Sequence, residues 1–215
     1  MLLALQDASS QFSFFDLIFS GGWANVLIIG VLFALLVYAL YLSIERFLIY
    51  RAVLRQDDQF VKEVKRHIRD PKKAMASCEQ ADHIMVSVFR AALNRLEQGK
   101  GKDQISLTFE TRTTYIVSQL ERHLNTLATI SGAAPMLGFL GTVIGMVIAF
   151  KEMAMSAGQA DISQLAGGIY TALTTTVAGL VVGIISYIAY NQLVNVLQRI
   201  TQRFESMVNV ILEEL

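Results

Sequence analysis

Residues 124–150 read LNTLATISGAAPMLGFLGTVIGMVIAF and contain no Asp, Glu, Lys, Arg or His. A helix rises about 1.5 Å per residue, so this stretch is long enough to cross about 30 Å of hydrocarbon. Charge returns at once with Lys151 and Glu152. We therefore predict a membrane-spanning helix over 124–150, and this stretch decides the fold class.

Two further windows lack charge in the same way. Residues 24–44 are 21 residues in which only Asn25 and Ser43 are strongly polar, and residues 162–198 are 37 residues without charge. The second of these windows is longer than a bilayer is thick, so part of it leaves the membrane. We predict transmembrane helices over 24–44 and 165–192.

The chain beyond the third membrane helix, 193–215, is predicted to be a cytoplasmic amphipathic helix. Its apolar residues recur at intervals of three or four, which is typical of a helix that packs on another helix. They are Leu193, Leu197, Ile200, Phe204, Met207, Ile211 and Leu215. The predicted partner is the helix from Gln104, which carries a comparable ridge of Ile105, Phe109, Ile116, Leu120 and Leu124.

The composition agrees with a membrane protein built from helices. The chain is 53% apolar and 17% charged, which lies outside the ordinary soluble range. Two prolines in 215 residues favour long uninterrupted helices. The predicted fold class is an all-α membrane protein with three transmembrane helices, the second and third of which extend into a cytoplasmic helical domain.

That domain, residues 45–123, is predicted to hold three helices. The first covers about 57–69, and the second follows Asp70-Pro71 and includes the amphipathic stretch 82–98. A third helix begins at Gln104 with Asp103 as its N-cap. Because no helix breaker follows until Gly132, we predict that it runs on into the membrane without a break.

The basic residues predict the orientation. None precedes the first membrane helix and only Lys151 lies between the second and third, while the other seventeen lie in the large loop and the tail. The positive-inside rule puts that loop and the carboxyl terminus in the cytoplasm, and puts the amino terminus and the short loop 151–164 in the periplasm. Residues 1–23 lack a basic signal-peptide region and are predicted to form an interfacial helix, with a tail of no fixed structure as the alternative.

The sequence offers no site for an enzyme, a metal or another cofactor. Cys78 is the only cysteine, and His67, His83 and His123 are scattered. Ser131, Ser163 and Ser186 have no histidine or aspartate partner within the predicted membrane segments, which argues against an intramembrane protease. We predict that the chain is not an enzyme, and nothing in it points to nucleic acid.

The three membrane segments also contain no ionisable group of the kind that loads and releases an ion in a pump. Two of them instead carry a face of small and hydroxylic residues. In the second helix it consists of Ala128, Gly132, Pro135, Gly138, Thr142, Gly145 and Ala149, and in the third of Gly168, Thr171, Thr175, Gly179, Gly183 and Ser186. Such faces serve close packing within one chain, or a lumen formed by several copies.

These residues resemble a known family. The segments APMLGFLGTVIGM at 134–146, followed by Phe150, and GIYTALTTTVAGL at 168–180, followed by Tyr190-Asn191, resemble the two signature membrane helices of the ExbB/TolQ/MotA proton-channel family. Ile44-Glu-Arg-Phe is similar to the end of its first helix. The resemblance runs from about residue 24 to the end and is weak in the cytoplasmic loop. Three membrane helices resemble the ExbB and TolQ branches, with ExbB the closer.

The resemblance implies a homopentameric ring in the bacterial inner membrane around a single-span ExbD- or TolR-like partner. The partner's membrane aspartate supplies the missing ionisable group, and proton-motive force becomes work on a TonB-like protein for outer-membrane transport. By motif position Thr142 and Thr176 face the lumen, with Thr175 and Thr171 in the same pathway. A helical wheel places Thr175 nearer the centre of the small-residue face than Thr176. The residues that pack the helices around the pore are then Gly138, Gly141, Gly145, Gly179, Gly183 and Pro135.

Two positions depart from the family pattern. Many ExbB and TolQ members carry a glutamate where this chain has Thr171, and a proline within the stretch that here reads Ile184-Ile-Ser-Tyr187. Loss of the glutamate leaves the partner's aspartate as the only carrier of the ion. A TolQ-like role in envelope integrity, a scaffold that conducts nothing, and sodium as the coupling ion stay open.

Overall fold

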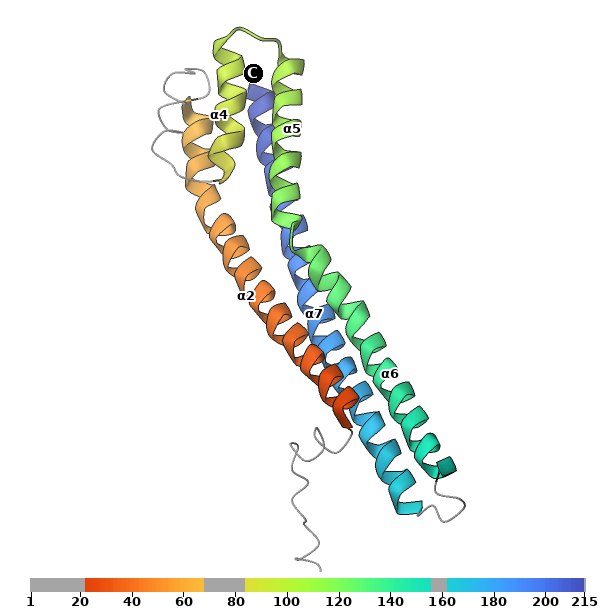
Figure 1. The fold of residues 1–215 in the computed structure, drawn as a ribbon. Coiled ribbons are helices and arrows are strands. Elements are labelled where there is room, and N and C mark those ends of the chain that lie inside the picture. Colours follow the sequence, from red (N-terminus) through yellow and green to blue (C-terminus); the bar gives the residue numbers. More distant parts are fainter. Residues whose placement is uncertain (1–21, 68–83, 156–161, 215) are drawn as a thin grey trace, which may run out of the picture. The chain divides into compact units, whose positions relative to one another are not determined.

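The computed structural model describes residues 22–67, 84–155 and 162–214, and every regular element within them is an α-helix. In chain order (Figure 1) these are α2 (Gly22–His67), α4 (Ile84–Glu97), α5 (Lys102–Glu121), α6 (Leu124–Met155) and α7 (Ile162–Glu214). Three stretches of helix are long and apolar enough to cross a membrane: Trp23–Leu54, Lys102–Met155 and Leu165–Asn209. The predicted helical class with three membrane helices is confirmed to this extent.

Several predictions fall outside the described residues. They are the interfacial helix up to Gly21, the helix start at Asp70-Pro71, Cys78, His83, and residues 156–161 of the short loop.

Helix α2 is longer than predicted. It runs unbroken from Gly22 to His67, whereas the sequence was interpreted as one helix over 24–44 and another over about 57–69. The first charges after the apolar window, Glu45 and Arg46, limit how deep a helix lies in a bilayer, but they do not end it. Residues 45–56 contain neither glycine nor proline, so nothing in the backbone interrupts the helix.

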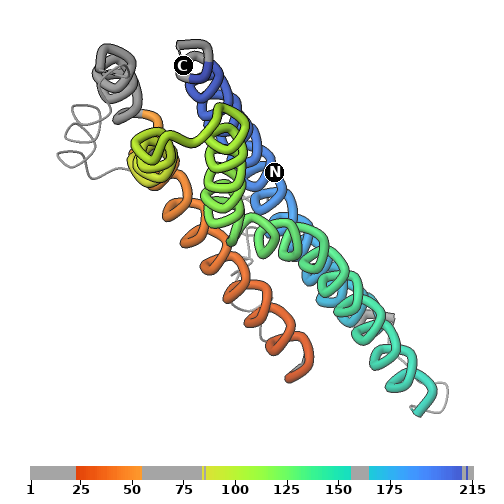
Figure 2. The backbone as a smooth tube through the Cα atoms, turned by 90° about the horizontal axis from the view of Figure 1, so that it is seen from above, coloured from red at the N-terminus to blue at the C-terminus, as the bar shows by residue number. Residues whose placement is uncertain are grey.

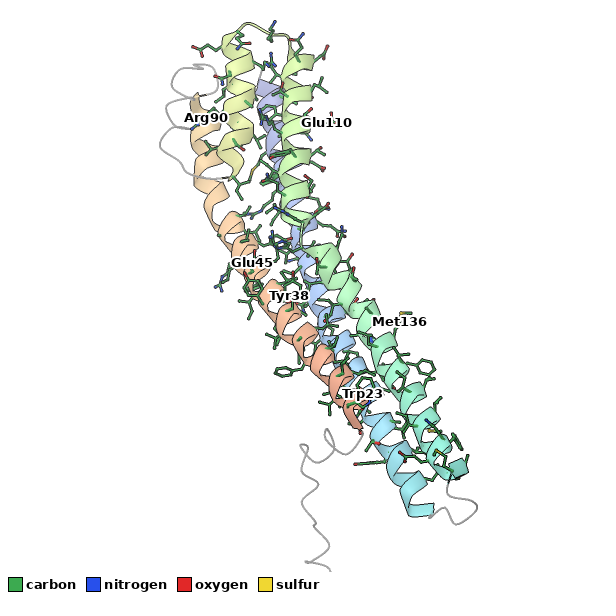
Figure 3. All side chains as sticks on the ribbon, viewed as in Figure 1. Trp23, Tyr38, Glu45, Arg90, Glu110 and Met136 are labelled. Atoms are coloured by element: carbon green, nitrogen blue, oxygen red, sulfur yellow. The ribbon has the colours of Figure 1, made fainter. Side chains whose placement is uncertain are left out.

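The chain divides into two compact units. The first, called here the apolar unit, comprises 22–41, 126–155 and 162–188, and the second, the polar unit, comprises 42–67, 84–125 and 189–214. In the apolar unit, α6 and α7 lie side by side in both views (Figures 1 and 2). Large apolar side chains such as Trp23 and Met136, labelled in Figure 3, point outward. A surface of this kind suits lipid or other membrane helices.

The polar unit has an ordinary buried core. Phe89 of α4 and Phe109 of α5 meet edge to face with ring centroids 5.7 Å apart. The predicted stripe of α7 is buried from Leu193 to Phe204, and so is the predicted ridge of α5 from Ile105 to Leu120. The apolar residues of the predicted amphipathic segment 193–215 are thus buried as far as Phe204.

The prediction of one continuous helix from Gln104 into the membrane is wrong. Helix α5 ends at Glu121, and α6 begins at Leu124 after a two-residue turn that contains neither glycine nor proline. The last carbonyls of a helix lack intrahelical partners. Here Tyr50 of α2 donates from its hydroxyl to the carbonyl of Leu120 at 2.9 Å, which satisfies one of them. A side chain from a distant helix thus stabilises the end of α5.

The start of α5 also differs. Gly101 is the N-cap, in an extended conformation, and makes no side-chain capping bond, whereas Asp103 was predicted to be the cap. Asp103 instead lies in the first turn. Its carboxylate is favourable there because the amino-terminal end of a helix carries partial positive charge.

Candidate functional site

Helices α6 and α7 approach each other at backbone distance around two glycines. A Cβ atom placed on Gly179 would lie 2.6 Å from the carbonyl oxygen of Ala134, and one placed on Gly138 would lie 2.7 Å from the carbonyl oxygen of Thr175. Both neighbours are backbone atoms, which cannot turn aside as a side chain can. The sequence uses glycine here because a larger residue would separate the helices.

The same contact extends along the pair. Gly145 lies against the Cβ atom of Ala172, which a new Cβ would meet at 2.7 Å, and Gly183 lies against Pro135, whose Cγ it would meet at 2.6 Å. Gly141 lies against the side chain of Thr175. All six residues predicted to pack the helices therefore lie in the contact between α6 and α7 within one chain. Their further role around a lumen stays a prediction.

Thr175 lies inside this contact and is fully buried. Its hydroxyl is 2.7 Å from the carbonyl oxygen of Ala172 in its own helix and 3.1 Å from that of Gly138 in α6. A hydroxyl with one proton shares it between two such acceptors. Thr175 therefore links the two helices.

Thr142 and Thr176 meet at the edge of the contact, and both are half-buried. The hydroxyl of Thr176 lies 3.3 Å from that of Thr142 and 3.1 Å from the carbonyl oxygen of Gly138. Thr142 donates to the carbonyl oxygen of Phe139 at 2.6 Å. A hydroxyl accepts a hydrogen bond from a protonated carboxylic acid and, after rotation, donates one to a carboxylate. The pair suits both protonation states of an acidic guest.

Thr142 also lines a hollow of about 650 Å³ on the outer face of α6. The other lining residues are Phe139, Val143, Met146, Val147, Phe150 and Lys151. Except for Lys151 at one end, all of these are apolar. The surface suits an apolar helix that places one polar group opposite Thr142.

Thr171 lies apart from this pair. Its hydroxyl donates to the carbonyl oxygens of Gly167 and Gly168 in its own helix, at 3.1 and 3.0 Å. The structure thus gathers Thr142, Thr175 and Thr176 around Gly138, and leaves Thr171 bonded within α7.

One cluster was not predicted. In the polar unit, Arg46 of α2 is buried at 7% exposure, and its Nη2 lies 2.7 Å from Nδ1 of His123 and 3.3 Å from the carboxylate of Glu45. Because a guanidinium has only donors, His123 accepts through Nδ1 and carries its proton on Nε2. The cluster holds the turn between α5 and α6. The Ile44-Glu-Arg-Phe motif was visible in the sequence, but its contact with a residue 77 positions away was not.

We expect His123→Ala to lower the free energy of unfolding by about 1.5–3 kcal/mol, because it removes a hydrogen bond to a buried charge. His123→Asn should restore most of this loss, since the Asn Oδ1 sits where Nδ1 was and also accepts. Arg122→Ala, a neighbouring exposed change, is the control. Thermal unfolding of the detergent-solubilised protein gives the comparison, and equal midpoints for His123→Ala and Arg122→Ala would contradict the proposed role of the histidine.

Comparison with known proteins bears on what such a site does. Residues 80–206, more than half of the chain, match the MotA/TolQ/ExbB proton channel family. The chain is 32% identical over 171 residues to ExbB-like protein 1 of Synechocystis sp., covering 77% of this chain and 67% of that one. It is 27% identical over 159 residues to the biopolymer transport protein ExbB of Neisseria gonorrhoeae, covering 67% and 72%. It is 38% identical over 77 residues to the Tol-Pal system protein TolQ of Haemophilus influenzae, covering 36% and 33%.

Proposed function

Since this chain belongs to the MotA/TolQ/ExbB proton channel family, we propose that it is the ring subunit of a proton-driven motor in the bacterial inner membrane. Five copies surround a single-span, ExbD-like partner that carries a membrane aspartate. The assembly converts proton-motive force into work on a TonB-like protein for transport across the outer membrane. The amino terminus is periplasmic and the carboxyl terminus cytoplasmic.

One observation carries the proposal. In the apolar unit, residues 22–41, 126–150 and 162–188 contain no Asp, Glu, Lys, Arg or His. Within this unit the hydroxyls of Thr142 and Thr176 lie 3.3 Å apart, beside an apolar hollow. Hydroxyls cannot carry a proton across a membrane alone, because neither titrates near neutral pH. A carboxyl group from another polypeptide supplies what is missing.

The threonines take different roles in this proposal. Thr142 and Thr176 face the lumen and exchange hydrogen bonds with the partner's carboxyl group as it gains and loses a proton. Thr175 is fully buried between α6 and α7, so its role is to hold the two helices together. Thr171 stands at the position of the family glutamate. It lies in α7, as Thr175 and Thr176 do, and adds a further hydroxyl to the pathway.

Reconstitution in liposomes tests the proposal. The chain alone should pass no protons under an imposed pH gradient, and addition of the single-span partner should produce a flux. Replacing the partner's membrane aspartate with asparagine should abolish that flux. Proton flux from the chain alone would contradict the proposal that the partner supplies the ionisable group. If neither the chain alone nor the chain with its partner passes protons, a scaffold that conducts nothing is favoured.

A TolQ-like role in envelope integrity is the second candidate, because the chain is also similar to TolQ of Haemophilus influenzae. Both candidates share the ring and the proton step, and they differ in the protein that receives the work. Affinity purification of the chain from its native membrane separates them: a TonB-like protein among the bound proteins supports the first, and Tol-Pal components support the second.

A further inference from the structure

A groove in the polar unit runs between α5 and α7. It consists of two adjoining hollows of about 710 and 480 Å³ that share Val117, Thr201 and Glu205. The apolar stripes of both helices are buried, and apart from Leu124 and Leu197 the groove is lined by other residues of this unit.

The groove is acidic. Glu110 and Glu121 of α5 and Glu205 of α7 line it, and no Lys, Arg or His among the described residues does so. Figure 3 labels Glu110 on α5. Arg112 of α5 lines a separate hollow with α4, and Arg203 of α7 donates to the carbonyl oxygen of Leu54 at 3.3 Å. Three carboxylates thus share one groove without a cation lining it.

A second observation points to an occupant. Thr113 lines the smaller hollow and is only 9% exposed, yet its hydroxyl has no hydrogen-bond partner among the described residues. A buried hydroxyl left unpaired is unfavourable, because it has lost its hydrogen bonds to water. A peptide backbone laid in the groove offers both donors and acceptors to satisfy it.

We infer that this groove binds a basic peptide segment, namely the cytoplasmic end of the single-span partner. The inference rests on the proposed function. In single-span membrane proteins, Lys and Arg accumulate on the cytoplasmic side of the membrane helix, and the polar unit holds the helices predicted to be cytoplasmic. The positively charged groups of the partner's Lys and Arg side chains pair with Glu110, Glu121 and Glu205. The methylene chains of the same side chains contact Val117 and Val208.

Photo-crosslinking in the complete complex tests the inference. A benzophenone amino acid at Thr114, which is exposed and lines the groove, should crosslink the partner. The matched control is Thr111, which is also exposed and lies one turn away on α5. It lines the hollow shared with α4, so the same amino acid at Thr111 should not crosslink the partner. Crosslinking of Thr114 to a second copy of this chain, or to nothing, would overturn the inference.

Charge reversal adds an energetic readout. The double variant Glu121→Lys, Glu205→Lys should lower the crosslinking yield at Thr114 by about tenfold or more, because like charges at an interface are strongly unfavourable. Glu97→Lys, an exposed change at the end of α4, should leave the yield unchanged. An equal yield in all three proteins would show that the carboxylates do not recognise the partner.

The two proposals fail in different ways. If the partner does not co-purify with the wild-type chain and no partner-dependent proton flux appears, the proposed function fails. If the partner co-purifies and the flux is normal while Thr114 gives no crosslink to it, only the groove assignment fails.

Discussion

Gly179→Ala is expected to lower the free energy of unfolding by about 3 kcal/mol, at the upper end of the cost of overpacking a well-packed core. The added Cβ would lie 2.6 Å from the carbonyl oxygen of Ala134 and 2.9 Å from Cα of Gly138. Relief requires α6 and α7 to move apart, which also stretches the bond from Thr175 to Gly138. Thermal unfolding in detergent and the amount of protein in the membrane measure the effect.

The chain offers a matched control for this substitution. Gly167 lies in the same helix, and a Cβ atom there would meet nothing within 4 Å, whereas its neighbour Gly168 would meet the Cβ of Ala149 at 2.8 Å. We expect Gly167→Ala to be neutral or slightly stabilising, since alanine favours a helix over glycine by about 1 kcal/mol. Gly168→Ala should be destabilising. Equal stability of Gly167→Ala and Gly179→Ala would show that the close approach of the helices is not what the glycines serve.

Thr142→Val and Thr176→Val are each expected to reduce partner-dependent proton flux by about tenfold or more. Valine keeps the shape of threonine but loses the hydroxyl, and a hydrogen bond to a charged group is worth about 1.5–3 kcal/mol. The flux into liposomes is measured at equal amounts of assembled complex. Thr142→Ser and Thr176→Ser keep the hydroxyl and should retain most of the flux.

Two other threonines separate conduction from packing. Thr174 belongs neither to the Thr142–Thr176 pair nor to the hollow beside it, so Thr174→Val should leave the flux unchanged. Thr175→Val should mainly lower stability, by about 1 kcal/mol, because it removes the bond to Gly138. If Thr175→Val abolished flux with stability intact while Thr142→Val did not, the roles assigned to these residues would be reversed.

The choice between Thr175 and Thr176 shows what the sequence was able to predict. The helical wheel placed Thr175 nearer the centre of the small-residue face than Thr176, and in the structure this part of the face is where α7 meets α6 of the same chain. Periodicity shows which residues share a face and not which neighbour covers it. Burial and the contact with Thr142 separate the two threonines, because Thr175 is fully buried whereas Thr176 is half-buried and lies 3.3 Å from the hydroxyl of Thr142.

The membrane helices and the α7 stripe were predictable because hydrocarbon and a helical core each impose a regular pattern of apolar residues. The turn at Arg122 and His123 was not, because no local signal marks it. It forms through Tyr50 and Arg46 of α2, which contact residues 70 and 77 positions away. The continuity of α2 was not predicted because the charges from Glu45 onward were interpreted as the end of the helix. Residues 45–56 contain no glycine or proline, so the helix continues through them.

The glycine contact limits how α6 and α7 can move relative to each other. Two helices that touch through backbone atoms have no layer of flexible side chains between them, so sliding one against the other would bring main-chain atoms into collision. In the proposed ring, we therefore expect each α6–α7 pair to move as one rigid unit and the motion to occur in the central partner. Spin labels on Ile148 of α6 and Leu173 of α7 should report the same separation with and without an ion gradient. A change in that separation would show that the two helices move relative to each other.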